Sequence, residues 1–86
     1  VAALGPFDWI VIDAGHYAHE VQADWERYAP MAAPGGVIAL HDILPAAVDW
    51  IQVDQVWATI QAEGYVTQEL IASRTVDWGG WGLVYR

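Results

Sequence analysis

The chain has 86 residues, of which 56% are hydrophobic, so it has enough apolar material for one compact core and too little length for two domains. Eleven acidic residues stand against three arginines and no lysine, which gives a formal net charge of −8 at pH 7. This charge repels phosphate backbones and anionic lipid surfaces, so nucleic acid and membranes are excluded as expected partners. The absence of cysteine excludes disulfides and thiolate metal sites and, with no leader and no apolar run of about 20 residues, favours a cytoplasmic protein.

The first predicted strand is FDWIVID, residues 7–13. Its nearly continuous apolar run of β-branched and aromatic residues is typical of a strand buried on both faces. From residue 17 to residue 28, large apolar side chains recur at intervals of four, four and three, which predicts an amphipathic helix. Pro30 favours the end of this helix near residue 28.

A turn at Pro34-Gly35-Gly36 leads into a second apolar run, residues 37–41. The succession of strand, helix and strand predicts a right-handed βαβ unit, whose two parallel strands end on the same side of the sheet. A second helix is predicted over residues 52–63, with Gly64 after its last turn. Two further strands are predicted, an exposed one over 65–71 and a last one over 81–86.

Polar residues follow both strands of the βαβ unit. Asp13 ends the first strand, and His41 and Asp42 end the second. Ligands of open parallel sheets lie at the carboxyl ends of the strands, so these side chains are candidates for one small site. Two carboxylates and an imidazole suit a divalent cation. Magnesium prefers oxygen ligands only, whereas a histidine ligand favours manganese, iron, nickel or zinc. The alternative is that Asp13 caps a helix or orients a loop, and that His41 and Asp42 only close a strand.

His16 lies at the mouth of the same crevice, and imidazole exchanges protons near neutral pH, so His16 is a candidate general base. The alternative is a role in the helix N-terminus or on the surface. His19 is predicted to be a surface residue.

The six tryptophans fall into two groups. Those on core-facing patterns are expected to pack inside the protein: Trp9, Trp25 and Trp57. Those in or beside loops are candidates to stack on a substrate ring: Trp50, Trp78 and Trp81. The glycines of GGWG, residues 79–82, do not open a helix after a strand and are therefore no phosphate-binding loop.

The ordered motifs resemble the second half of the class I S-adenosylmethionine-dependent methyltransferases. The likeness rests on the spacing within FDWIVIDAGHYAHEVQADWERYAPMAAPGGVIALHDI, with VDQVWATI and WGLVYR similar to that family's next helix and last strand. The resemblance implies an α/β fold, the C-terminal half of a Rossmann-like doubly wound sheet, mostly parallel with a final antiparallel strand. Residues 1–86 would form a single partial domain, and the cofactor-binding N-terminal half would be absent.

The branch that it most resembles contains metal-dependent, sugar-modifying O-methyltransferases. By that resemblance Asp13, His41 and Asp42 would bind a divalent metal, Mg or Mn, and His16 would be the catalytic base. The sequence departs from the branch at His41, where such relatives more often carry a carboxylate. The implied reaction is O-methylation of a small hydroxylated substrate, such as a sugar or natural product, with Trp50 and Trp78 beside the substrate.

The resemblance also implies that S-adenosylmethionine is bound mainly by the missing half. The expected partners are therefore that half or a second copy of the chain, besides the small-molecule substrate. The alternative function is that of a non-catalytic α/β fragment or pseudo-enzyme domain, an interaction module that docks through its tryptophan-rich faces.

Overall fold

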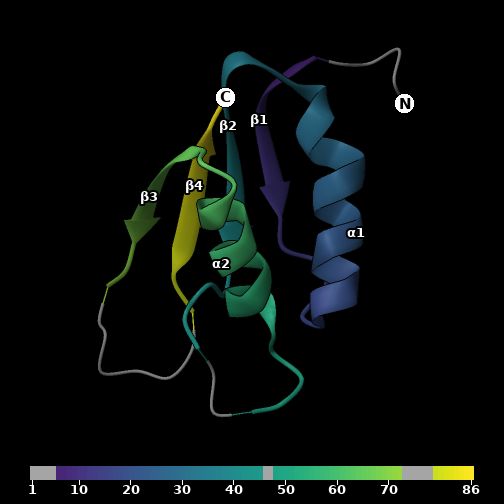
Figure 1. Ribbon diagram of the computed structural model, residues 1–86, viewed down its shortest axis with the longest axis vertical. Coiled ribbons are helices and arrows are strands. Elements are labelled where there is room, and N and C mark those ends of the chain that lie inside the picture. Colours follow the sequence, from purple (N-terminus) through teal and green to yellow (C-terminus); the bar gives the residue numbers. More distant parts are fainter. Residues whose placement is uncertain (1–5, 46–47, 73–78) are drawn as a thin grey trace.

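The computed structural model describes residues 6–45, 48–72 and 79–86, and Figure 1 shows the arrangement of their helices and strands. The elements follow one another in this order: β1 (Phe7–Ile12), α1 (Ala18–Tyr28), the 3₁₀ helix η2 (Ala29–Met31), β2 (Ala32–His41), α2 (Val53–Ala62), β3 (Val66–Leu70) and β4 (Trp81–Tyr85). Every helix and strand predicted from the sequence is present. The largest difference is β2, which begins five residues earlier than predicted, at Ala32 instead of Val37.

The strands form one sheet in the order β1-β2-β4-β3. The β1–β2 pair is parallel, whereas β4 is antiparallel to both of its neighbours. This confirms the α/β class and the final antiparallel strand. Because β4 lies between β2 and β3 and runs against both, β1, β2 and β3 share one direction, and their carboxyl ends meet at the lower edge of the sheet in Figure 1. The insertion of β4 between its neighbours was not predicted.

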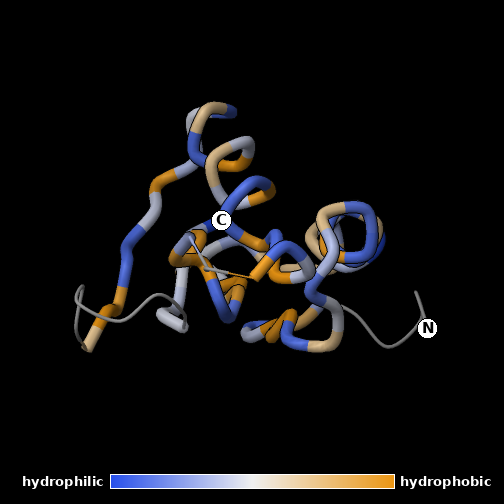
Figure 2. Tube along the Cα trace, turned by 90° about the horizontal axis from the view of Figure 1, so that it is seen from below, coloured by the Kyte–Doolittle hydropathy of each residue, from blue (hydrophilic) through white to orange (hydrophobic). Residues whose placement is uncertain are grey.

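The core lies between one face of the sheet and the two α-helices, which cover the same side in Figure 2. Trp25 of α1 and Trp57 of α2 are buried there, as predicted. The side chains buried most completely come from both layers: Ile38, Leu40, Ile60, Val21 and Val84. Each Å² of apolar area removed from water contributes about 25 cal/mol to the stability of the fold. Because most of the buried apolar side chains lie in this layer, it is the main source of stability.

The opposite face of the sheet, here called the outer sheet face, is lined by apolar side chains: Trp9, Val11, Ala39, Leu70, Trp81 and Leu83. Within the described ranges no helix covers it, and Trp9 is 64% and Val11 60% exposed. The predictions that the first strand is buried on both faces and that Trp9 packs in the core are therefore wrong for this structure. Alternate residues of a strand point to opposite faces, so only Ile10 and Ile12 of β1 face the helices.

The Pro-Gly-Gly turn forms a bulge at the start of β2. Phe7 pairs with Ala32, but Trp9 pairs with Val37, so β2 has three more residues than β1 between these pairs. Gly36 sits against the β1 backbone, where a Cβ would lie 3.0 Å from the carbonyl oxygen of Asp8. The bulge thus sets the register of every later pair between β1 and β2.

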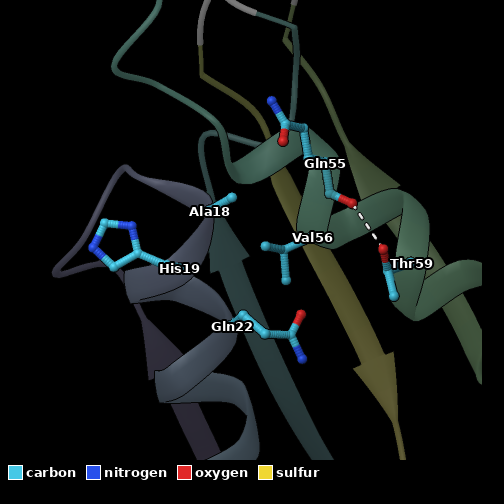
Figure 3. Close-up of a pocket in the computed structure, with 6 residues that line it drawn as sticks. All are labelled: Ala18, His19, Gln22, Gln55, Val56 and Thr59. Carbon is cyan, nitrogen blue, oxygen red and sulfur yellow. Dashed lines mark hydrogen bonds between the residues drawn. The ribbon is translucent and has the colours of Figure 1, made fainter.

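A groove separates α1 from α2 on the covered side of the sheet (Figure 3). Gln22 and Val56 point into it, and Thr59 of α2 donates a hydrogen bond to the Gln55 carbonyl oxygen, 3.1 Å away. His19 also lines this groove and is exposed, which confirms it as a surface residue.

Among the described residues, no helix has both the length and the apolar character needed to cross a membrane.

Gly82 of β4 allows the Trp57 ring to lie directly on the backbone, since a Cβ at this position would come within 2.6 Å of the ring. We expect Gly82→Ala to lower the free energy of unfolding by about 1–3 kcal/mol, because the core must move to admit the methyl group. Urea denaturation measures this loss. In a Trp57→Leu background the same substitution should cost less, and an equal cost in both backgrounds would contradict the packing explanation.

Candidate functional site

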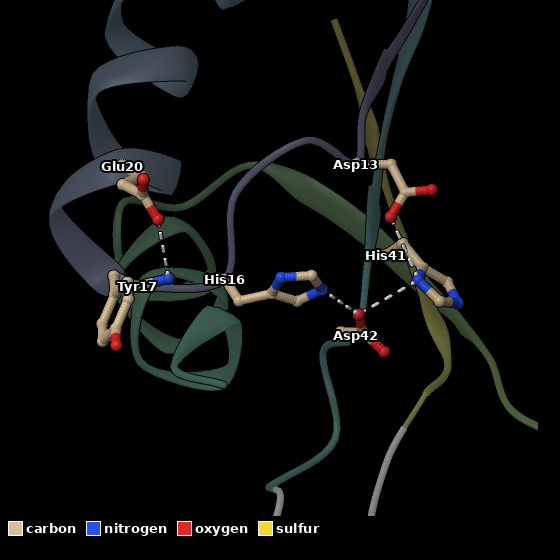
Figure 4. Close-up of polar contacts among 6 residues, drawn as sticks. All are labelled: Asp13, His16, Tyr17, Glu20, His41 and Asp42. Atoms are coloured by element: carbon tan, nitrogen blue, oxygen red, sulfur yellow. Dashed lines mark hydrogen bonds and ion pairs between the residues drawn. The ribbon is translucent and has the colours of Figure 1, made fainter. Parts of the chain in front are cut away.

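The predicted metal ligands lie together at the carboxyl ends of β1 and β2 (Figure 4). The last pair of the two strands is Ile12 with Leu40, so Asp13 and His41 stand side by side at the next step. His41 Nδ1 is 3.2 Å from Asp13 Oδ1 and 3.2 Å from Asp42 Oδ2. The structure therefore brings together all three residues that the sequence singled out.

Asp42 has an unusual backbone. Its φ is +67°, which makes it the one non-glycine residue with positive φ in the described part of the chain, and it is buried. Aspartate is among the few residues that tolerate this left-handed conformation. The Asp42 N–H donates to the Gly80 carbonyl at 2.9 Å, and the Leu44 N–H donates to the Gly79 carbonyl at 3.1 Å. These bonds hold the chain in the turn that presents the Asp42 carboxylate to the site.

His16 joins the cluster from the loop between β1 and α1. Its Nε2 is 3.2 Å from Asp42 Oδ2, the same oxygen that His41 approaches from the other side. The loop then enters α1, where the Tyr17 N–H donates to Glu20 Oε1 at 3.3 Å. One carboxylate oxygen thus links the candidate base to the candidate metal ligands, a contact that was not predicted from the sequence.

Two tryptophans flank this cluster. Trp50, which is 48% exposed, meets the His16 ring edge to face at a centroid distance of 5.3 Å. Trp81 lies against His41 at 4.6 Å, with the ring planes tilted by 49°. Trp50 therefore lies beside His16, and Trp81 packs against one of the candidate metal ligands; a contact of Trp50 with a substrate stays a prediction. Trp78, the other predicted substrate residue, lies outside the described residues.

Gln52 also contacts this region and was not singled out from the sequence. Its side-chain Oε1 accepts a hydrogen bond from the Ala18 N–H at 2.9 Å. Its backbone N–H donates a hydrogen bond to the His16 carbonyl at 2.6 Å. The available signal was weak, because a glutamine at the start of a predicted helix is common and its partners lie far away in the sequence.

The donor set fits a divalent cation. One atom from each of Asp13, His41 and Asp42 lies within 4.8 Å of the other two. Neighbouring ligands of an ion bound at about 2.1 Å are about 3 Å apart, close to the two 3.2 Å separations at His41 Nδ1. In the absence of an ion, a proton on Nδ1 satisfies the same two carboxylates, so the site suits either occupant.

The chain was compared with known proteins. A family model described as a methyltransferase domain matches residues 1–43, which is half of the 86-residue chain and includes Asp13, His16, His41 and Asp42. Searches of curated proteins and of solved structures found no match.

The backbone at residue 42 gives a testable expectation. Asp42→Val should destabilise the chain by about 1–3 kcal/mol, because a β-branched residue is strained at positive φ. Asp42→Asn should change stability little, since Asn tolerates this conformation. Thermal unfolding followed by circular dichroism measures both. Asp13→Val is the matched control, as Asp13 is exposed and lacks a positive φ; a loss as large as that of Asp42→Val would refute the backbone argument.

Proposed function

The chain belongs to the methyltransferase domain family, and on that basis we propose that it is the substrate-side half of an S-adenosylmethionine-dependent methyltransferase. The proposed reaction is O-methylation of a small hydroxylated molecule, such as a sugar or natural product. The observation that carries the proposal is the 3.2 Å contact of His16 with Asp42, beside a donor set that suits a metal and at the carboxyl edge of the sheet. Ligands of this class of sheet bind at that edge.

The proposed setting is a Rossmann-like doubly wound sheet, of which residues 1–86 form a part. The shared direction of β1, β2 and β3 and the antiparallel β4 support it. A doubly wound sheet has helices on both faces, and the exposed Trp9 and Val11 mark the face that would receive the second layer. The proposed occupant of that face is the cofactor-binding half, with a second copy of the chain as the other expected partner.

His16 is the proposed base. When its Nε2–H donates to Asp42, the lone pair of the neutral imidazole is on Nδ1. Nδ1 of His16 would then receive the proton of the acceptor hydroxyl. The Asp42 carboxylate would stabilise the resulting imidazolium, as a carboxylate does in other acid–base pairs. Trp50 would border the acceptor on the same side.

Asp13, His41 and Asp42 would hold the divalent cation. Such an ion, when bound, favours the ionised form of an acceptor hydroxyl and orients its oxygen. Magnesium prefers oxygen ligands only, so the imidazole of His41 favours Mn²⁺ over Mg²⁺.

When bound, S-adenosylmethionine would supply the methyl group of its sulfonium, and breaking of the sulfur–methyl bond would leave S-adenosylhomocysteine. The hydroxyl proton of the acceptor would pass to His16. The chain's own contribution is to bind the acceptor and remove that proton. Binding of the cofactor is assigned mainly to the other half of the domain.

A non-catalytic interaction module is the second candidate, favoured by the exposed outer sheet face. Such a module has no need of His16, so the experiment on His16 distinguishes the two functions.

In a protein that contains the complete methyltransferase domain, His16→Ala should lower turnover by about 10²- to 10⁴-fold, because the proton acceptor is lost. Calorimetry should show unchanged binding of S-adenosylmethionine. His19→Ala is the matched control, an exposed histidine three residues away, and should leave turnover unchanged. Full turnover by His16→Ala would exclude His16 as the base.

The 86-residue chain itself tests the metal site. Added Mn²⁺, which is paramagnetic, should broaden the His41 ring signals in NMR spectra. Asp13→Asn should raise the Mn²⁺ concentration needed for the same broadening by about tenfold. Asp8→Asn removes an exposed carboxylate at the other end of β1 and should change nothing. Identical titrations of the wild type and Asp13→Asn would remove Asp13 from the site.

A further inference from the structure

We propose that Gln52 is a positioning residue that ties the loop after β1 to the loop after β2 and thereby holds His16 in place. The inference rests on the proposed function only in that His16 is the base there. Its structural content, the position of the His16 ring against Trp50, is independent of any reaction.

The first tie is between Gln52 and the start of α1. Ala18 is the first residue of α1, and its N–H has no acceptor within its own helix. Gln52 Oε1 accepts that hydrogen bond at 2.9 Å, across 34 residues of sequence, in a partly buried position. The backbone N–H of Gln52 donates a second hydrogen bond, to the His16 carbonyl at 2.6 Å. The backbone on both sides of Tyr17 is therefore fixed by one residue of the other loop.

The second tie lies within the loop that carries Trp50. Gln52 Nε2 donates to the Asp49 carbonyl at 3.0 Å, so the chain closes around Trp50 between these two residues. Trp50 then stands edge to face with the His16 ring, whose Nε2 reaches Asp42. The Gln52 side chain therefore bonds both to the loop that carries Trp50 and to the first residue of α1, two residues after His16. Together with the backbone bond from Gln52 to His16, these contacts confine the His16 ring between Trp50 and Asp42.

The Gln52 side chain bonds to other parts of the chain and not to the helix that it begins. It occupies the N-cap of α2, where Ser, Thr, Asp and Asn are preferred because a short side chain can bond to the helix's own N–H groups. The Gln52 side chain makes no such bond to α2 and reaches α1 instead. Only a carboxamide of this length is both acceptor for Ala18 and donor to Asp49; Glu retains the acceptor alone, and Met retains neither.

NMR spectroscopy of the 86-residue chain at one fixed pH tests the proposal. The His16 ring signals, identified by their loss in His16→Gln, carry a ring-current shift from Trp50 that Trp50→Leu removes. We expect Gln52→Met to change the His16 signals in the same direction as Trp50→Leu. It should also accelerate hydrogen exchange of the Ala18 amide by about tenfold, because its acceptor is lost. Gln61→Met, at an exposed glutamine of the same helix, should change neither signal.

Gln52→Glu separates the two ties. The Ala18 amide should stay protected, because the acceptor remains, while the His16 signals should shift, because the bond to the Asp49 carbonyl is lost. Unchanged His16 signals in Gln52→Met would overturn the proposal. If that variant does not fold, as judged by circular dichroism, unchanged His16 signals in Gln52→Glu would overturn it equally. Neither result depends on turnover, so a failure here and a failure of the His16→Ala experiment are distinguishable.

Discussion

The parallel pairing of β1 with β2 is the constraint on which the site depends. Parallel neighbours end at the same edge, and their register decides which terminal side chains meet. Here the register ends with Ile12 opposite Leu40, so Asp13 and His41 follow as neighbours. A slip by one residue would turn Ile12 away from the helices and separate the two polar side chains. The same pairing therefore stabilises the core and assembles the donor set.

The bulge at the start of β2 sets that register. Three extra residues separate Ala32 from Val37 relative to the β1 partners, and Gly36 lets the two backbones approach closely. The chain thus fixes the geometry of a site at one end of the strands by an irregularity at the other end. Asp42 adds a second irregularity, its positive φ, where the regular strand has ended.

The sequence predicted much of this arrangement because the relevant signals are local. Apolar periodicity marked the helices and strands, and strand-terminal polar residues marked Asp13, His41 and Asp42. The exposure of Trp9 could not be predicted, since an apolar run does not reveal whether a second layer covers it. The link from Asp42 to His16 depends on one backbone angle, and the contacts of Gln52 span 34 residues. Neither has a signature in local sequence, and the same is true of the insertion of β4 between β2 and β3.

Trp81 belongs to two surfaces at once. It lines the outer sheet face and also packs its ring against His41. Alternate residues of a strand share a face, so Asp13 follows Trp9 and Val11 on the outer sheet face, and His41 follows Ala39 there. These two members of the donor set therefore stand at the border of the apolar face. A substitution of Trp81 therefore changes two things at once, the apolar surface of the outer sheet face and the packing of the His41 ring.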